Sequence, residues 1–420
     1  MLLITSPRKG KSAFMGCLFL LLGLASGYVI NPYLDSELLP ENVVDELLDL
    51  ITDKGRKISH QNQQLYPVEN SIWRTPKDLG QITGVGVDPA GNPVIFHRAD
   101  RTWDYGSFDD TFKFRETFKG PINQDTVLTL NPKSGSVESS WGSNMFYLPH
   151  GLHIDARGNV WLTDVALHQV FKTKISKKSL LKRLKIRKPL LSPFTPGSTN
   201  PDLILGEALT PGSDNDHFCQ PTSVAIANTG EIVVADGYCN NRIIVLDPFG
   251  NIINIIPRPG EFVALRVPHA LTILEQGDVC VADRENMRVI CMSLREGFPP
   301  DNEQDKRGPP LTLHAPDLGR VFAVASHGTH TIILNLTPSN TLYAVNGPTS
   351  PMIPVRGFIM DPNSETVFGH WAPTSGMFTQ PHAMAISPNA TELYVTEIGP
   401  NRIWKFDLVK NSLHQETPLE

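Results

Sequence analysis

The segment VPHAL at 267–271, followed by VCVAD at 279–283, decides the fold of this chain. Three more segments follow the same scheme, in which a Pro in second position opens a short apolar run and a second run ends on an acidic residue. They begin at residues 148, 220 and 380. Short apolar runs separated by turn residues are typical of β-strands. The chain is therefore built on a strand-rich repeat.

Further copies extend this repeat. TGVGV at 83–87 leads to VIFH at 94–97, and a weaker copy lies between residues 321 and 360. Pro221 and Pro268 stand 47 residues apart, a spacing that fits one blade of a β-propeller, whereas the period of a right-handed β-helix is shorter. The sequence therefore predicts an all-β, six-bladed β-propeller, and its repeats resemble those of the NHL family.

The composition fits such a fold. The 420 residues include 35 Pro and 32 Gly, which favour a chain of many turns. Hydrophobic residues make up 40% and charged residues 19%, as in ordinary soluble globular proteins. The formal net charge of -6 offers no electrostatic basis for binding nucleic acid, and no nucleic-acid partner is expected.

The first residues carry a secretory signal pattern. A basic stretch precedes the apolar run at 13–25 and small residues follow it, so residues 1–27 are predicted to be a cleaved signal peptide. The alternative is a signal anchor that extends through 28–30. We expect a protein that is secreted or held in the lumen of secretory vesicles, without stable membrane insertion. Sequons at Asn335 and Asn389 are candidate glycosylation sites.

Segments of other composition flank and interrupt the repeats. A run of Lys and Arg between two strand-like segments predicts a solvated loop. The chain is expected to divide into a signal peptide at 1–27, a non-repeat segment at 28–75, a propeller at 76–410 with a basic inserted loop at 172–200, and a C-terminal tail at 411–420.

The cysteines agree with secretion. Cys17 lies in the predicted signal peptide, which leaves four others. An even number of Cys in an oxidising compartment predicts two disulfides. Three pairings are possible, and the phase of the repeat favours Cys219 with Cys239 and Cys280 with Cys291.

Three repeats carry a His directly after the Pro, namely His150, His269 and His382, while a fourth has Thr222 at this position. Residues at the same position of different repeats are said to share a phase. In a propeller, residues at one phase of the inner strands converge on the central axis. Three converging imidazoles form a zinc site whose fourth position stays open to water or substrate. The alternative is that Pro-His is a structural turn at the start of each inner strand.

A second phase carries cationic and phenolic side chains. Arg98 and Arg284 occupy equivalent positions in different repeats, and Tyr238 falls one position later in a third. Two guanidinium groups can hold a carboxylate, and they would also favour the ionised form of a nearby phenol. Taken singly, each arginine could instead be a surface or blade-bridging residue.

Longer strings carry a specific resemblance. From about residue 81 to 406 the chain resembles the peptidyl-α-hydroxyglycine α-amidating lyase family. The strings that carry the resemblance include IFHR at 95–98, FYLPHGL at 146–152, TDVALHQVF at 163–171, HFCQPT at 217–222, DGYCN at 236–240 and CVADREN at 280–286.

The resemblance implies a role for each residue of the two phases. It implies zinc binding by the three in-phase His, catalysis by Tyr238, and substrate binding by Arg98 and Arg284. It implies the same two disulfides that the repeat phase favours.

The family also holds a structural calcium through two backbone carbonyls, which correspond to Val85 and Leu152, and through an acidic residue after the last His. Ala383 stands at that acidic position, and Gln380 stands where the family has Met. This chain is therefore expected to bind calcium much less tightly than its relatives.

The implied reaction splits a peptidyl-α-hydroxyglycine into an α-amidated peptide and glyoxylate, the second step of peptide amidation. A separate copper monooxygenase would act first and supply the substrate, and the lyase itself is expected to be a stand-alone monomer. One alternative is an NHL-type binding scaffold, a lyase relative with weakened activity. The other is a calcium-dependent hydrolase of the lactonase type, which needs converging acidic and Asn side chains where this repeat supplies His.

Overall fold

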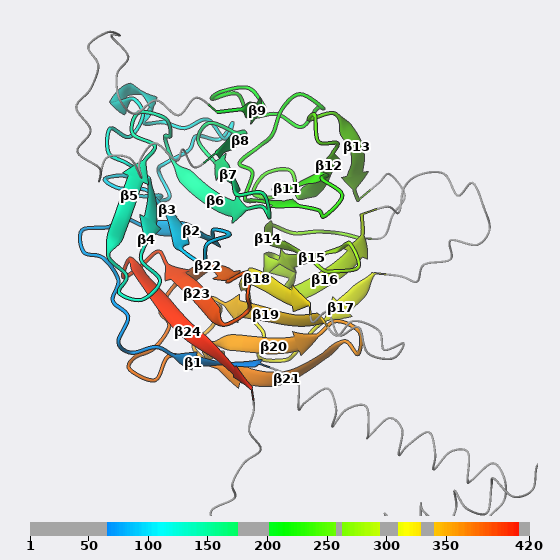
Figure 1. The fold of residues 1–420 in the computed structure, drawn as a ribbon. Helices are drawn as coiled ribbons and strands as arrows, with labels where there is room; N and C mark the ends of the chain where they lie inside the picture. Colours follow the sequence, from blue (N-terminus) through cyan, green and yellow to red (C-terminus); the bar gives the residue numbers. More distant parts are fainter. Residues whose placement is uncertain (1–64, 175–200, 258–262, 295–309, 329–339, 411–420) are drawn as a thin grey trace, which may run out of the picture. The chain divides into compact units, whose positions relative to one another are not determined.

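The structure, a computed structural model, describes residues 65–174, 201–257, 263–294, 310–328 and 340–410. These residues form six antiparallel sheets of four strands each, and no α-helix occurs among them. Figure 1 shows the sheets set around a common centre. The predicted all-β, six-bladed propeller is confirmed.

Each blade runs from an inner strand near the axis to an outer strand at the rim. The first three blades consist of β2 (Ile82–Val87), β3 (Pro93–His97), β4 (Val127–Leu130) and β5 (Val137–Trp141); β6 (Pro149–Ile154), β7 (Asn159–Asp164), β8 (Gln169–Lys174) and β9 (Leu203–Leu205); and β10 (Ser223–Ile226), β11 (Ile232–Asp236), β12 (Arg242–Leu246) and β13 (Ile252–Ile256).

The last three blades repeat this order, except that the outer strand of the sixth blade comes from the start of the described chain. They consist of β14 (Pro268–Ile273), β15 (Asp278–Asp283), β16 (Arg288–Ser293) and β17 (Leu311–Leu313); β18 (Val321–Gly328), β19 (Asn340–Asn346), β20 (Gly357–Asp361) and β21 (Thr366–Trp371); and β22 (Pro381–Ile386), β23 (Glu392–Glu397), β24 (Arg402–Lys410) and β1 (Leu65–Glu69).

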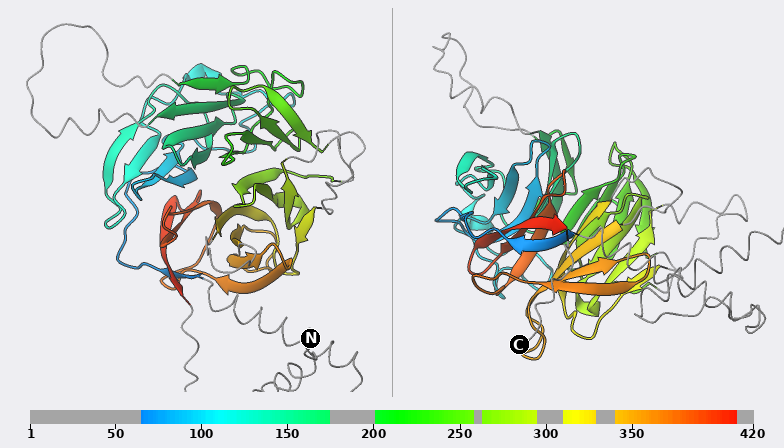
Figure 2. Two further views of the ribbon diagram at one scale, coloured as in Figure 1. Left: turned by 45° about the vertical axis from the view of Figure 1, so that its right-hand side comes forward. Right: turned by 60° about the horizontal axis from the view of Figure 1, so that its bottom comes forward.

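The inner strands close into a ring. They contact one another in the cyclic order β2, β6, β10, β14, β18, β22 and back to β2. The ring is completed by β1, which pairs antiparallel with β24 from Leu65 opposite Lys410 to Glu69 opposite Phe406. Both views of Figure 2 show this blue N-terminal strand beside the red C-terminal one.

β1 lies inside the segment 28–75 that the sequence analysis left outside the propeller. A lone outer strand has no hairpin partner next to it in the sequence, so it lacks the repeat pattern that marks the other strands. The Tyr343 hydroxyl of the fifth blade donates a 2.7 Å hydrogen bond to the carbonyl of Leu65. The first and last parts of the described chain are thus joined by both a sheet and a side chain.

Local turn chemistry sets the hairpins between first and second strands. Asp88 Oδ1 accepts hydrogen bonds from the N–H groups of Ala90 at 2.9 Å and Asn92 at 2.8 Å. Asp155 makes the equivalent bonds to Arg157 and Asn159 in the second blade. An Asp that bonds its own turn in this way stabilises a tight reversal.

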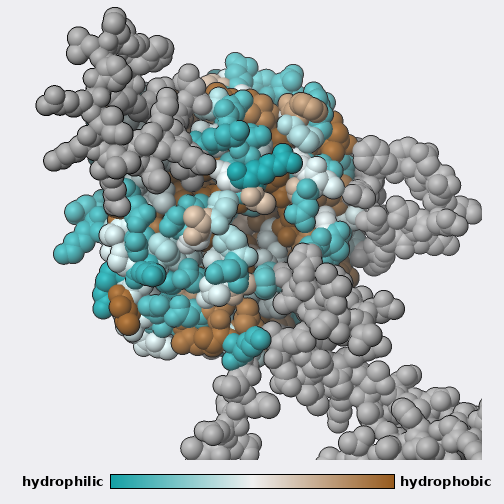
Figure 3. Space-filling view, viewed as in Figure 1, coloured by the Kyte–Doolittle hydropathy of each residue, from teal (hydrophilic) through white to brown (hydrophobic). Residues whose placement is uncertain are grey.

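The hydrophobic core lies between the blades. Between the third and fourth blades, for example, Val233 and Ile243 belong to one buried cluster with Val281 and Ile290. Burial of apolar surface contributes roughly 25 cal/mol per Å², so these interfaces hold neighbouring blades together. On the face seen in Figure 3, hydrophilic residues interrupt the apolar ones across the described surface.

Two disulfides bind strands or connections within single blades. Cys219 pairs with Cys239 in the third blade, and Cys280 pairs with Cys291, which lies directly opposite it on the neighbouring strand. These are the two pairs that the repeat phase favours. Asn389, one of the two sequon residues, lies at the surface.

Several sequence predictions fall outside the described residues. These are the signal peptide, most of the basic loop, Asn335 and the C-terminal tail. β8 continues to Lys174, so the first residues of the predicted loop at 172–200 are strand. Within the described ranges, no helix has the length and apolar character needed to cross a membrane.

The closure by β1 leads to a prediction. A chain that begins at Asn70 lacks β1 and leaves β24 as an unpaired edge strand, so its thermal unfolding midpoint should fall by at least several degrees. The matched control begins at Leu65 and keeps β1. Circular dichroism melts of the two truncated proteins test this. Equal midpoints would show that β1 does not stabilise the ring.

Candidate metal centre and active site

A β-bulge near the start of the inner strand positions the in-phase residues. In five blades, the pairing between the first two strands shifts register there. A bulge leaves a residue out of the ladder and redirects its side chain. The shifts fall at Thr83, His150, His269, Phe322 and His382.

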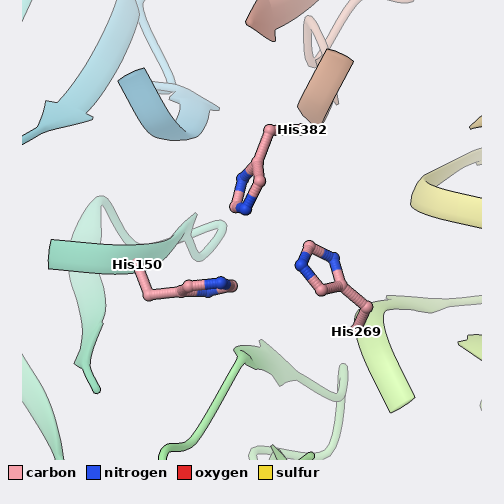
Figure 4. A group of neighbouring side chains, drawn as sticks. All are labelled: His150, His269 and His382. Carbon is pink, nitrogen blue, oxygen red and sulfur yellow. The ribbon is translucent and has the colours of Figure 1, made fainter. Parts of the chain in front are cut away.

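Three of these residues meet at the axis. One ring nitrogen of each of His150, His269 and His382 lies within 4.8 Å of the corresponding nitrogens of the others, and all three side chains are buried. Figure 4 shows the imidazoles pointing toward one another from separate blades. Among the residues that the structure describes, this is the one group of His, Cys, Asp or Glu side chains that could hold a metal ion.

Backbone carbonyls fix the tautomer of each ring. A carbonyl oxygen can only accept, so each Nδ1 must carry the proton and each Nε2 must present a lone pair. The three Nδ1–H groups donate to carbonyls of the next blade: His150 to Thr222 at 2.7 Å, His269 to Phe322 at 2.7 Å and His382 to Thr83 at 2.8 Å.

Burial keeps these imidazoles neutral. It lowers the pKa of His150 and His269 well below the ordinary value, and it lowers the pKa of His382 to about 3. Nearby positive groups, including Arg98, act in the same direction. The neutral imidazole is the form that binds metal ions, so no proton has to be displaced at physiological pH.

The donor set fits a metal cation. The Tyr238 hydroxyl lies 3.0 Å from His150 Nε2 and 3.2 Å from His269 Nε2, but its single proton can satisfy only one of these lone pairs. No described residue donates a hydrogen bond to His382 Nε2. At least two of the three buried nitrogen ligands therefore lack a donor, which suits a metal ion with a further position left for another ligand.

Tyr238 reaches the axis because its connection lies close to the next blade. A Cβ at Gly237 would stand 2.2 Å from the carbonyl oxygen of Pro268, so this position accepts only Gly. The disulfide of Cys239 to Cys219 fastens the other side of Tyr238. The phenol is thereby held between two of the three His.

Arg98 is buried beside this group with one guanidinium nitrogen unused. Its Nε donates to the carbonyl of Pro149 at 2.9 Å, and Nη1 donates to Gln81 Oε1 at 2.7 Å. Its Nη2 is buried and has no hydrogen-bond partner in the described part of the chain. Burial lowers the pKa of Arg98 to about 10, so the group remains a cation at neutral pH. A buried unpaired N–H of a cation is suited to an anionic ligand.

Arg284 flanks Tyr238 from another blade. Its guanidinium carbon lies 5.3 Å from the centre of the Tyr238 ring and 5.1 Å from that of Phe322. Its Nε donates to Glu285 Oε1 at 3.0 Å, and Oε2 of the same Glu pairs with Arg320 at 3.0 Å. The structure therefore gathers every predicted zinc, catalytic and substrate residue around one point.

Sequence reasoning missed residues that support this point. Phe322 occupies the phase of the His in the fifth blade, but its repeat has Val instead of Pro before it. Gln81 and Glu285 each bind one of the two arginines through side-chain bonds that no short motif reveals. An alignment of the repeats could have identified Phe322, because it stands at the position that a His occupies in three other blades.

The backbone positions considered for calcium line the central cavity. Val85, Leu152 and Ala383 contribute to a cavity of about 290 Å³ that also contains the three His. The residues described as lining it include no Asp or Glu. Gln380 has an exposed side chain outside this lining.

Known proteins share the repeat and most of the chain. The NHL repeat model matches residues 218–246 and 265–292. The chain is 47% identical over 381 residues to peptidyl-alpha-hydroxyglycine alpha-amidating lyase 2 of Drosophila melanogaster, across 86% of this chain and 84% of that protein. It is 38% identical to peptidyl-glycine alpha-amidating monooxygenase B of Xenopus laevis, across 82% of this chain but 36% of that protein. A solved streptogramin B lyase structure is similar with a TM-score of 0.44 and 11% identity, over 83% of this chain and 99% of that one.

The His cluster leads to a prediction about metal content. The purified protein should hold about one metal ion per chain, and His269→Ala should lose it because two imidazoles bind far more weakly than three. The matched control is His153→Ala, which changes a His that lines the same cavity outside the cluster. Elemental analysis after gel filtration measures both. Full metal retention by His269→Ala would contradict the three-His centre.

Proposed function

The chain belongs to the peptidyl-α-hydroxyglycine α-amidating lyases, and from this membership we propose that it is a zinc-dependent enzyme that cleaves peptidyl-α-hydroxyglycine into an α-amidated peptide and glyoxylate. The observation that carries the proposal is the meeting of three neutral imidazoles with the Tyr238 hydroxyl between two arginines. A lyase of the amidation pathway needs these groups because its substrate carries a hydroxyl to deprotonate and a carboxylate to hold.

The substrate carboxylate is assigned to the two arginines. Arg98 offers its unpaired Nη2 from a buried position, which makes an ion pair strong because water is excluded. Arg284 lies on the other side of Tyr238 with its Nε engaged by Glu285. A carboxylate bound between them places the neighbouring carbinol carbon beside the phenol.

Tyr238 is assigned the proton transfer. As the phenolate it takes the proton from the substrate hydroxyl. The C–O bond then becomes the C=O of glyoxylate and the C–N bond breaks. The amide nitrogen keeps the electron pair of that bond and takes the proton that Tyr238 removed from the hydroxyl, which restores the phenolate. Zinc held by His150, His269 and His382 would supply a Lewis acid that makes a bound oxygen more acidic. No water is consumed, so the reaction is an elimination.

The setting of the reaction follows from its chemistry. A carbinolamide substrate must come from hydroxylation of a glycine-extended peptide, so we propose that a copper monooxygenase supplies it. Two disulfides are compatible with the oxidising secretory compartment in which peptides mature. The exposed Asn389 would be open to glycosylation there.

Two alternatives are less well supported. A lactonase-type hydrolase needs acidic calcium ligands at the axis, and the described lining of the central cavity contains none. A binding scaffold without activity would have no need of a phenol, an unpaired guanidinium nitrogen and three imidazoles in one place. The one argument for weakened activity is that Ala383 and Gln380 differ from the residues that the family has at these positions.

The proposed function predicts glyoxylate release from an α-hydroxyglycine-extended peptide, lost on treatment with a chelator and restored by zinc. Tyr238→Phe should keep fold and metal but lower kcat by about 10²–10⁴-fold, the usual cost of losing a general base. The substitution keeps the ring that packs near Trp103 and removes only the oxygen. Colorimetric glyoxylate assays measure turnover. Wild-type turnover by Tyr238→Phe would exclude the phenol as the base.

A further prediction concerns calcium. Calcium prefers six to eight oxygen ligands and gains much of its affinity from carboxylates. Ala383 offers no side-chain oxygen, so millimolar calcium should leave the melting temperature of the zinc-loaded protein nearly unchanged relative to EGTA. Ala383→Asp should create a calcium-dependent rise. A large rise in the unaltered protein would reveal a carboxylate ligand from elsewhere in the chain.

A further inference from the structure

One connection sets the first blade apart. The link between the second and third strands spans 98–126 there, whereas the equivalent links of the other blades span 165–168, 237–241, 284–287, 347–356 and 398–401. These links leave the blades on the face that carries Arg98, Tyr238 and Arg284. The segment 98–126, named here the first-blade loop, is therefore extra structure on the face of the proposed active site.

The first-blade loop is firmly held against the second blade. Arg101 donates through Nη2 to the carbonyl of Gly120 at 3.1 Å, which joins two parts of the loop itself. The N–H of Ile122 donates to the carbonyl of Phe146, just before the second blade, at 2.8 Å. Phe114 is buried in a cluster with Leu148 of the second blade. The loop thus presents its side chains from a fixed backbone.

The loop places Trp103 beside the reacting groups. The ring of Trp103 lies 4.8 Å from that of Tyr238 and 6.2 Å from that of His150, centre to centre. The guanidinium carbon of Arg98 lies over Trp103 at 5.2 Å, and Phe108 packs against it at 5.2 Å. Trp103 and Phe108 are both partly exposed, and no described residue accepts a hydrogen bond from the Trp103 indole N–H.

We propose that Trp103, backed by Phe108, binds the side chain of the residue that precedes α-hydroxyglycine and makes the enzyme prefer peptides with an aromatic or large apolar residue there. The proposal rests on the proposed function, which puts the carbinol carbon between Tyr238 and the arginines. Consecutive Cα atoms lie about 3.8 Å apart, so the preceding side chain falls within reach of a ring that touches Tyr238.

The charge of Arg98 beside Trp103 also affects which residue is preferred before α-hydroxyglycine. Arg98 lies over the Trp103 ring and remains charged, so a basic side chain at this position meets a like charge in a partly desolvated place. An aromatic side chain can instead stack on Trp103 and Phe108. The expected order of kcat/KM for the preceding residue is Phe, then Ala, then Lys.

The experiment compares three N-acetylated Xaa-α-hydroxyglycines, with Xaa as Phe, Ala or Lys, on zinc-loaded full-length protein. The wild type should favour Phe over Ala by about tenfold or more in kcat/KM, the usual effect of an apolar contact on selectivity. Trp103→Ala should bring that ratio near one, because kcat/KM falls more for the Phe peptide than for the Ala peptide, and Trp103→Phe should keep most of the ratio. The matched control is Tyr105→Ala, a fully exposed aromatic side chain of the same loop, which should leave the ratio unchanged.

Each other result counts against the inference. No preference in the wild type, or a preference that survives in Trp103→Ala, overturns it. If Trp103→Ala lowers kcat/KM equally for all three peptides, Trp103 positions Arg98 and Tyr238 and does not select the preceding residue, which also overturns the inference. If circular dichroism shows that Trp103→Ala does not fold, Trp103→Leu is measured in its place. A Phe-to-Ala ratio of kcat/KM equal to that of the wild type in Trp103→Leu overturns the inference. Absence of glyoxylate from every peptide with the wild type refutes the proposed function itself and removes the basis of this one.

Discussion

A chain of hydrogen bonds around the axis is the constraint on which the centre of the molecule depends. In five blades, the in-phase residue donates through its side chain to a backbone carbonyl of the next blade. The five bonds run from Thr83 to Pro149, His150 to Thr222, Thr222 to Pro268, His269 to Phe322 and His382 to Thr83. Three of these five bonds between neighbouring blades are thus also the bonds that fix the tautomer of the three imidazoles. Packing of the ring and chemistry of the site cannot be separated.

Buried carboxylates at the end of the second strand set the position of the inner strands. Asp164 accepts the N–H groups of Tyr147 and Leu148, just before His150, and Glu397 accepts those of Thr379 and Gln380, just before His382. Burial raises the pKa of Asp164, while the backbone bonds oppose that rise. A buried carboxylate must accept hydrogen bonds from the protein because water does not reach it. These bonds therefore hold the segments before His150 and His382 against Asp164 and Glu397.

The repeat made the architecture and the three His predictable, because a Pro-His pair and an acidic residue mark the same register in the sequence. Other features left no such mark. β1 lies far from its partner β24 in the sequence, and Phe322 replaces the His in a blade that has no Pro before it. The partners of the arginines, Gln81 and Glu285, depend on how the blades meet in space. Local pattern predicts strands, while contacts between blades determine the site.

The two arginines differ in the charge of their partners, and this difference shapes the site. Arg98 is held by neutral acceptors, the Pro149 carbonyl and Gln81, so its positive charge is not compensated by them. Arg284 shares Glu285 with Arg320, so part of its charge is balanced. Because the three imidazoles are neutral, Arg98 is the side-chain cation near Tyr238 whose charge is least balanced by its hydrogen-bond partners. In the proposed reaction, Arg98 would therefore contribute more to carboxylate binding than Arg284, which would also orient the phenol over which it lies.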